Sequence, residues 1–116
     1  MSTEPTVFER IVAREIPADI VFENERVIAF KDIAPQAPVH LLVVPKTEAY
    51  ENVAELASGD PALLAEVVAV AQKLAAEQSN GEYRLVFNSG PSAGQTVFHV
   101  HAHVLSGPIT EGSLGF

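Results

Sequence analysis

Histidine alternates with apolar residues near the carboxyl-terminal end of this chain, and this pattern limits the possible fold more than any other feature. His99, His101 and His103 are separated by one Val and one Ala. Successive side chains of a β-strand point to opposite faces, whereas a helix would spread the three histidines around its axis. We therefore predict a strand over residues 98–105, with the imidazoles on one face and the apolar residues under a helix layer.

Capping signals predict two helices. Thr6 and Glu9 have the spacing of a capping box, and the helix that they begin is expected to end before Pro17. Asp60–Pro61 is typical of a second helix start, because Asp caps free amides and Pro suits the first turn. Apolar residues then recur at intervals of three and four until Asn80–Gly81, which predicts a C-cap.

Short apolar runs predict the remaining strands of a single domain. A turn at Asn24 joins the first two strands as a hairpin, and the third is apolar enough to be central. Strands broken by two helices indicate an α+β fold with about five strands in a mostly antiparallel sheet. Besides residues 98–105, we expect strands at residues 20–22, 27–30, 40–44 and 84–88.

Charge and composition exclude several classes of protein. Among 116 residues, Asp and Glu number 15 against 7 Lys and Arg, a formal charge of -8, which argues against general nucleic-acid binding. The absence of cysteine excludes disulfides, thiolate zinc sites and a Cys nucleophile. With no signal-peptide pattern or bilayer-length apolar run in sight, we expect a soluble, cytoplasmic protein.

The three alternating histidines leave two functional interpretations open. Together with the distant His40 they could supply nitrogen ligands to zinc, copper or iron. Alternatively, one neutral imidazole attacks phosphorus while its neighbours hold oxygens and transfer protons. A nucleophilic ring would need its other nitrogen held by an acceptor, for which we expect a backbone carbonyl. A purely structural role is harder to support, because several partly buried imidazoles must each find partners.

The loop that precedes the histidines favours phosphoryl chemistry. Residues 88–96 supply small side chains, amides and hydroxyls, and their glycines let backbone N–H groups approach an anion closely. Such donors stabilise the charge of a phosphoryl transition state without a metal. They also explain how an acidic protein could hold a phosphate.

The chain resembles the histidine-triad (HIT) superfamily, and within it the Hint branch of nucleotide-binding phosphoramidases. Residues 99–105 match its pattern of three histidines alternating with apolar residues, and Gly94-Gln95-Thr96-Val97 precedes them. Residues 32–46, with their two prolines before His40, resemble the Hint loop and strand, and residues 8–17 resemble its opening helix. The resemblance implies a HIT domain at 7–105, between a polar tail at 1–6 and a tail at 106–116.

This resemblance implies a homodimer whose two sheets join into one, and a purine nucleotide substrate. His101 would attack the α-phosphorus of a nucleoside 5′-phosphoramidate or a related AMP derivative, and water would then release AMP from a nucleotidyl-histidine intermediate. His103 would contact the phosphate and assist the leaving group, while His40 and His99 would support the proton network.

The resemblance also implies a nucleotide site around the histidines. Asp32 would accept the ribose hydroxyls beside Ile33, and the base would lie against apolar side chains. Gly94 would keep the phosphate loop close to the substrate. The base contacts would be Phe8, Ile11 and Phe30, and the phosphate or leaving-group contacts would be Asn88, Gln95 and Thr96.

Three departures from the Hint pattern stand out. Thr96 replaces a common Ser, and the tail lacks the usual Gly-Gly-Arg and Trp. The zinc-binding cysteines of some bacterial relatives are missing, so we expect no structural zinc and no cofactor. Alternative functions are a Fhit-like dinucleoside polyphosphate hydrolase, a non-catalytic nucleotide-binding protein and a metal-binding protein.

Overall fold

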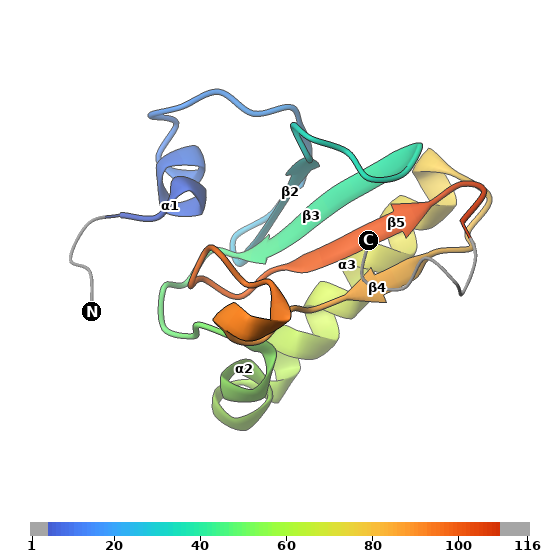
Figure 1. Cartoon of the computed structure of the whole chain (residues 1–116). Coiled ribbons are helices and arrows are strands. Elements are labelled where there is room, and N and C mark those ends of the chain that lie inside the picture. The colour runs from blue at the N-terminus through green and yellow to red at the C-terminus, as the bar shows by residue number, and fades with distance from the viewer. Residues whose placement is uncertain (1–4, 110–116) are drawn as a thin grey trace.

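The computed structural model describes residues 5–109 and confirms the five-stranded sheet (Figure 1). All neighbouring strands are antiparallel, in the order β1-β2-β3-β5-β4. The strands are β1 (Ile20–Glu23), β2 (Val27–Lys31), β3 (Val39–Pro45), β4 (Arg84–Val86) and β5 (Ala102–Ser106). The helices are α1 (Val7–Val12), α2 (Val53–Gly59) and α3 (Pro61–Gln78), with a short 3-10 helix η1 (Pro91–Ala93).

The sheet has two differently covered faces, which the alternation along β3 makes clear. Leu41 and Val43 belong to the core cluster beneath α3, together with Val67 and Leu74 of that helix. Leu42 and Val44 face the other way and pack with α1. Figure 1 shows the long α3 along one face of the sheet, with the short α1 well apart from α3. The six-residue α1 is much shorter than the 18-residue α3 on the opposite face.

Both predicted helix starts are confirmed. The Thr6 hydroxyl accepts a hydrogen bond from the Glu9 N–H at 3.2 Å, and α1 ends at Val12, ahead of Pro17. The Asp60 carboxylate accepts from the Leu63 N–H at 3.1 Å and so caps α3. These caps satisfy amides that have no partner within the helix.

A third helix, α2, was missed by the sequence analysis, which predicted only two. It has seven residues and buries only Leu56, so it has no apolar periodicity to detect. Its cap was readable, because the Asn52 side chain accepts from the Glu55 N–H at 3.0 Å, at the same three-residue spacing as in α1.

Two strands are shorter than predicted. The strand expected over 84–88 ends at Val86, and the one expected over 98–105 begins only at Ala102. The last pair between β3 and β5 is Val43 with Ala102. Beyond it, the Val100 N–H donates to the Tyr50 carbonyl at 3.1 Å instead of to a neighbouring strand. Phe98, predicted to face the helix layer, is instead 45% exposed.

The described residues include only parts of the two predicted tails. Residues 1–4 and 110–116 lie outside the described range, so most of the expected tails at 1–6 and 106–116 are not described. Within residues 5–109, no helix combines the length and apolar character needed to cross a membrane.

Candidate active site

Four imidazoles and one aromatic ring form a cluster on the α1 side of the sheet. His40 comes from β3 and His103 from β5, while His99 and His101 lie in the segment just before β5. The rings of His101 and His103 have centroids 5.1 Å apart, and those of His103 and His40 are 5.2 Å apart. Phe8 of α1 packs edge-on against both His99 and His101. The histidines therefore gather as the alternation predicted, although the strand covers only the last of the three.

A backbone carbonyl determines which nitrogen of His101 carries the hydrogen. Its Nδ1 lies 2.8 Å from the His99 carbonyl oxygen, which can only accept a hydrogen bond. The neutral ring is therefore protonated on Nδ1, and Nε2 keeps its lone pair. This is the acceptor that the sequence analysis expected for a nucleophilic imidazole.

His99 is the anchor of this arrangement. Its side chain is 1% exposed, and its Nε2–H donates to the Pro45 carbonyl at 2.6 Å. Pro45 is the last residue of β3, so this bond ties the segment before β5 to the end of its neighbouring strand. The buried ring thereby holds in place the carbonyl that orients His101.

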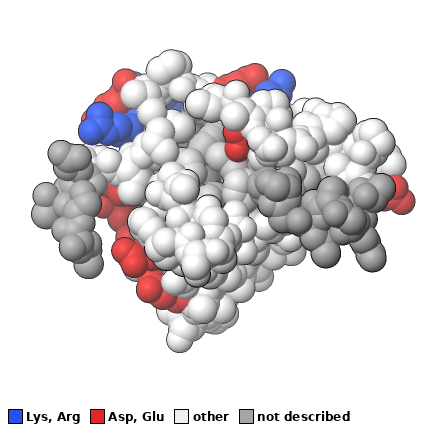
Figure 2. Space-filling view, in the orientation of Figure 1, with Lys and Arg blue, Asp and Glu red and all other residues white. Residues whose placement is uncertain are grey.

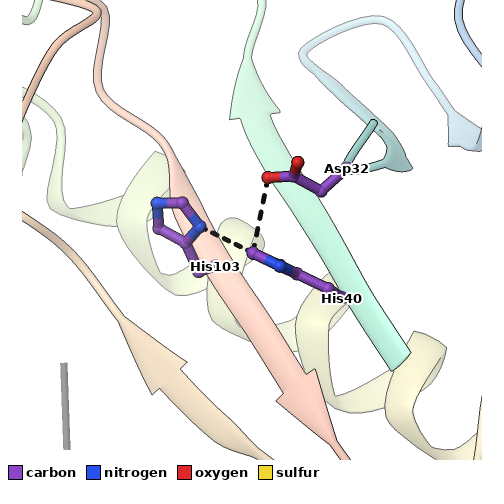
Figure 3. A group of neighbouring side chains, drawn as sticks. All are labelled: Asp32, His40 and His103. Atoms are coloured by element: carbon purple, nitrogen blue, oxygen red, sulfur yellow. Dashed lines mark hydrogen bonds and ion pairs between the residues drawn. The ribbon is translucent and has the colours of Figure 1, made fainter. Parts of the chain in front are cut away.

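His40 and His103 are joined directly, with Asp32 close by (Figure 3). His40 Nε2 lies 2.9 Å from His103 Nδ1 and 3.5 Å from Asp32 Oδ2. On its other side, His40 Nδ1 accepts a hydrogen bond from the Gln36 N–H at 3.0 Å. His40 is buried, whereas Asp32 and His103 are partly exposed.

Burial keeps these rings neutral near pH 7. It is the main reason that the pKa values of His40 and His101 lie below the ordinary value, and the nearby Asp32 carboxylate opposes this effect. The pKa of His103 is lowered to about 4, by burial first and then by the neighbouring His101 and His40. Neutral rings can act as nucleophiles and as hydrogen-bond donors at neutral pH.

A metal at this group would have to compete with the hydrogen bonds that join its members. Asp32, His40 and His103 offer ligand atoms that all lie within 4.8 Å of one another. However, the Gln36 N–H occupies the His40 Nδ1 lone pair, so the neutral ring carries its hydrogen on Nε2, which faces Asp32 and His103. A metal could bind this nitrogen only by displacing its hydrogen. In this structure, the three residues form a hydrogen-bonded group.

The loop expected to hold phosphate is braced by Gln95. This side chain is buried; its oxygen accepts from the Gly90 N–H at 2.8 Å, and its amide nitrogen donates to the carbonyls of Glu51 at 2.6 Å and Val97 at 3.0 Å. Gln95 thus shapes the loop with both ends of its amide. Gly94 has a φ of 92°, a conformation that favours glycine. Thr96 is exposed and Asn88 is partly buried.

The residues expected to contact a base occupy different environments. Phe8 and Phe30 are buried, with ring centroids 5.7 Å apart, and both belong to the core cluster between α1 and the sheet. Ile11 is also buried but borders a hollow of about 370 Å³, which Ile16 and Ile20 also line. Ile33, next to Asp32, is 98% exposed.

Two backbone groups of the site were missed by the sequence analysis. These are the Gln36 N–H on His40 and the Pro45 carbonyl on His99. Side-chain chemistry gives no signal for either. The only indication was position, since two prolines flank Gln36 four residues before His40.

Comparison with known proteins gives a consistent result. A model of the family described as the HIT domain matches residues 13–108. The chain is 47% identical, over 90% of its length and 92% of the relative, to an uncharacterised HIT-like protein from Synechococcus elongatus. It is 38% identical, over 92% of its length and 85% of the relative, to a 14 kDa zinc-binding protein from Zea mays.

Solved structures agree with this match. A HIT family hydrolase from Clostridium thermocellum superposes with a TM-score of 0.84 and 44% identity, covering 91% of this chain and 93% of that chain. A histidine triad protein from Clostridium difficile gives a TM-score of 0.84 and 34% identity, covering 95% and 96% of the two chains.

The lowered histidine pKa values predict that acid destabilises the fold. Below about pH 6.5 the unfolded chain takes up protons that native His103 resists until about pH 4, so the free energy of unfolding should fall as the pH drops through this window. Urea unfolding at pH 7 and pH 5, at one protein concentration, measures the fall. His103→Gln should show a smaller fall than the unsubstituted protein, and equal falls would contradict the assigned pKa.

Proposed function

This chain belongs to the HIT domain family, and from this premise we propose that it is a nucleotide hydrolase acting on nucleoside 5′-phosphoramidates or related AMP derivatives. One observation carries the proposal. His101 donates its only ring hydrogen to the His99 carbonyl and so keeps a lone pair on Nε2, and the centroid of its ring lies 5.1 Å from that of His103. That pairing suits a nucleophile with a neighbouring hydrogen-bond donor. The solved relative described as a HIT family hydrolase supports the same class of reaction.

In the first proposed step, His101 Nε2 forms a bond to the α-phosphorus and the phosphorus–nitrogen bond of the substrate breaks. The leaving nitrogen takes a proton from solvent while His103 Nε2–H donates a hydrogen bond to it, so that it departs as a neutral amine. The product is a nucleotidyl group on His101 and a free amine. The lowered pKa values keep both rings neutral at the start of this step.

In the second proposed step, water attacks the same phosphorus and the bond to His101 breaks. The attacking water gives up a proton to solvent, so that the two steps together consume no net proton. AMP leaves, and both imidazoles return to their initial states. N–H groups of the loop that includes Gly94 would hold the phosphoryl oxygens, which a protein with a net charge of -8 needs at this point.

We further propose that the nucleoside lies between the Asp32 loop and α1. Asp32 is partly exposed and could accept the ribose hydroxyls, with Ile33 beside it. The hollow bordered by Ile11 offers an apolar surface for the base. Phe8 and Phe30 would form the floor of this region, since both are nearly buried. Gln95 would act by shaping the phosphate loop, while Asn88 and Thr96 would contact the phosphate or leaving group.

A second copy of this chain is the proposed partner, joined at the β4 edge of the sheet. Within the described residues, β4 pairs on one side only, with β5. Val68 of α3 is 38% exposed, an apolar side chain that a partner could cover. Figure 2 shows a largely uncharged surface with Lys, Arg, Asp and Glu gathered mainly toward its outline. A strand at the end of a sheet can pair with a strand of another chain.

Removal of the proposed nucleophile tests the reaction. His101→Asn should lower AMP release from an adenosine 5′-phosphoramidate on the order of 10³-fold or more, because no second group can form the covalent intermediate. Its melting temperature and AMP affinity, measured in parallel, should stay close to those of the unsubstituted protein. Near-normal turnover would eliminate His101 as the nucleophile.

The substrate class is tested in the same assay. The unsubstituted protein should release AMP faster from the phosphoramidate than from a diadenosine polyphosphate at equal concentration. The reverse order would indicate a Fhit-like hydrolase, and nucleotide binding without turnover of either compound would indicate a non-catalytic protein.

The proposed homodimer is tested by mass in solution. Light scattering during size-exclusion chromatography should give twice the mass of one chain at micromolar concentration. The mass of a single chain at micromolar concentration would contradict the proposed dimer.

A further inference from the structure

We propose that the loop between Asp32 and Pro38 is a positioning element, which acts through the Gln36 backbone N–H to set the hydrogen of His103 on Nε2. The catalytic consequence rests on the proposed function, whereas the hydrogen positions are properties of the resting protein. A loop outside the triad segment would then determine which nitrogen of His103 can donate to a substrate.

The Gln36 N–H determines which nitrogen of His40 carries hydrogen. A backbone N–H can only donate, so the 3.0 Å contact from Gln36 requires a lone pair on His40 Nδ1. A neutral imidazole carries one hydrogen, which must therefore lie on Nε2. Protonating Nδ1 would break the bond to Gln36, and burial already opposes a charged ring.

The hydrogen on His40 in turn determines which nitrogen of His103 carries hydrogen. His40 Nε2–H faces two acceptors, His103 Nδ1 at 2.9 Å and Asp32 Oδ2 at 3.5 Å. The shorter distance is a normal hydrogen bond and the longer one is at the limit, so His103 Nδ1 accepts. The hydrogen of neutral His103 must then lie on Nε2.

The two rings that flank the reaction centre consequently have opposite tautomers. His101 carries its hydrogen on Nδ1 and presents a lone pair, whereas His103 carries its hydrogen on Nε2 and presents a donor. Without the Gln36 N–H, His40 could carry its hydrogen on Nδ1, and His103 Nδ1–H could donate back to His40. His103 would then present a lone pair, which repels phosphoryl oxygens and cannot donate a hydrogen bond to a leaving amine.

The loop holds the Gln36 N–H in place through several local contacts. Asp32 Oδ1 accepts from the Ala34 N–H at 2.8 Å, and the Asp32 N–H donates to the His40 carbonyl at 3.0 Å. The prolines on either side of Gln36 limit the backbone further. At the far end Gly107 approaches so closely that an added Cβ would lie 2.6 Å from the Pro38 ring. These contacts bind the loop to β3 and to the end of β5.

The experiment compares Gln36→Pro, which removes the N–H, with Gln36→Ala, which keeps it and removes only the side chain. Nitrogen-15 NMR of the imidazoles at pH 7, without ligand, reports which ring nitrogen of each histidine carries hydrogen. The unsubstituted protein and Gln36→Ala should show Nε2–H on His40 and His103, and Nδ1–H on His101. In Gln36→Pro, both His40 and His103 should shift toward Nδ1–H, while His101 stays unchanged as an internal control.

Activity provides the second readout. Gln36→Pro should lower kcat for AMP release roughly ten- to hundred-fold with a smaller change in KM, because a hydrogen-bond donor to the departing group is lost. Gln36→Ala should stay near the unsubstituted rate. A folded Gln36→Pro with unchanged tautomers would overturn the inference.

Two further outcomes are decisive. If Gln36→Pro does not fold, the spectrum of the unsubstituted protein decides: Nε2–H on both His40 and His103 supports the inference, and Nδ1–H on either overturns it. If the tautomers are as expected but no phosphoramidate is hydrolysed, the proposed function fails while the positioning role of the loop stands.

Discussion

The antiparallel pairing of β3 with β5 is the constraint on which the whole site depends. It sets Leu42 opposite His103 and His40 opposite Leu105, so that both imidazoles emerge on the α1 face of the sheet. Val43 points the other way, into the core beneath α3. A slip of one residue would exchange the two faces and bury the imidazoles among apolar side chains. The same strand pairing therefore stabilises the domain and places His40 beside His103.

Main-chain groups then decide what each imidazole can do. The Pro45 carbonyl holds the His99 ring, the His99 carbonyl orients His101, and the Gln36 N–H orients His40. Backbone geometry is fixed by the fold, so these partners cannot rotate away as a side chain could. Burial also acts on the site, because it lowers the pKa of His103 and keeps this ring uncharged near pH 7.

Much of this fold could be predicted from sequence because its strongest signals are periodic. The histidine alternation identified the face that the rings share, and the caps at Thr6 and Asp60 located two helices. The helix α2 buries only Leu56 and so has no period to detect. The last strand begins only at Ala102 because tertiary hydrogen bonds, such as the one from the Val100 N–H to the Tyr50 carbonyl, hold the residues before it. The contribution of Gln36 is a backbone donor and leaves no trace in residue type.

The central claim is that His101 forms a bond to phosphorus, so that hydrolysis proceeds in two displacements. Hydrolysis of an adenosine 5′-phosphorothioamidate of one phosphorus configuration in oxygen-18 water tests it without any substitution. Each displacement inverts the phosphorus, so the two proposed steps predict net retention of configuration in the product. Net inversion would show that water attacks the substrate directly, and it would contradict the covalent role of His101.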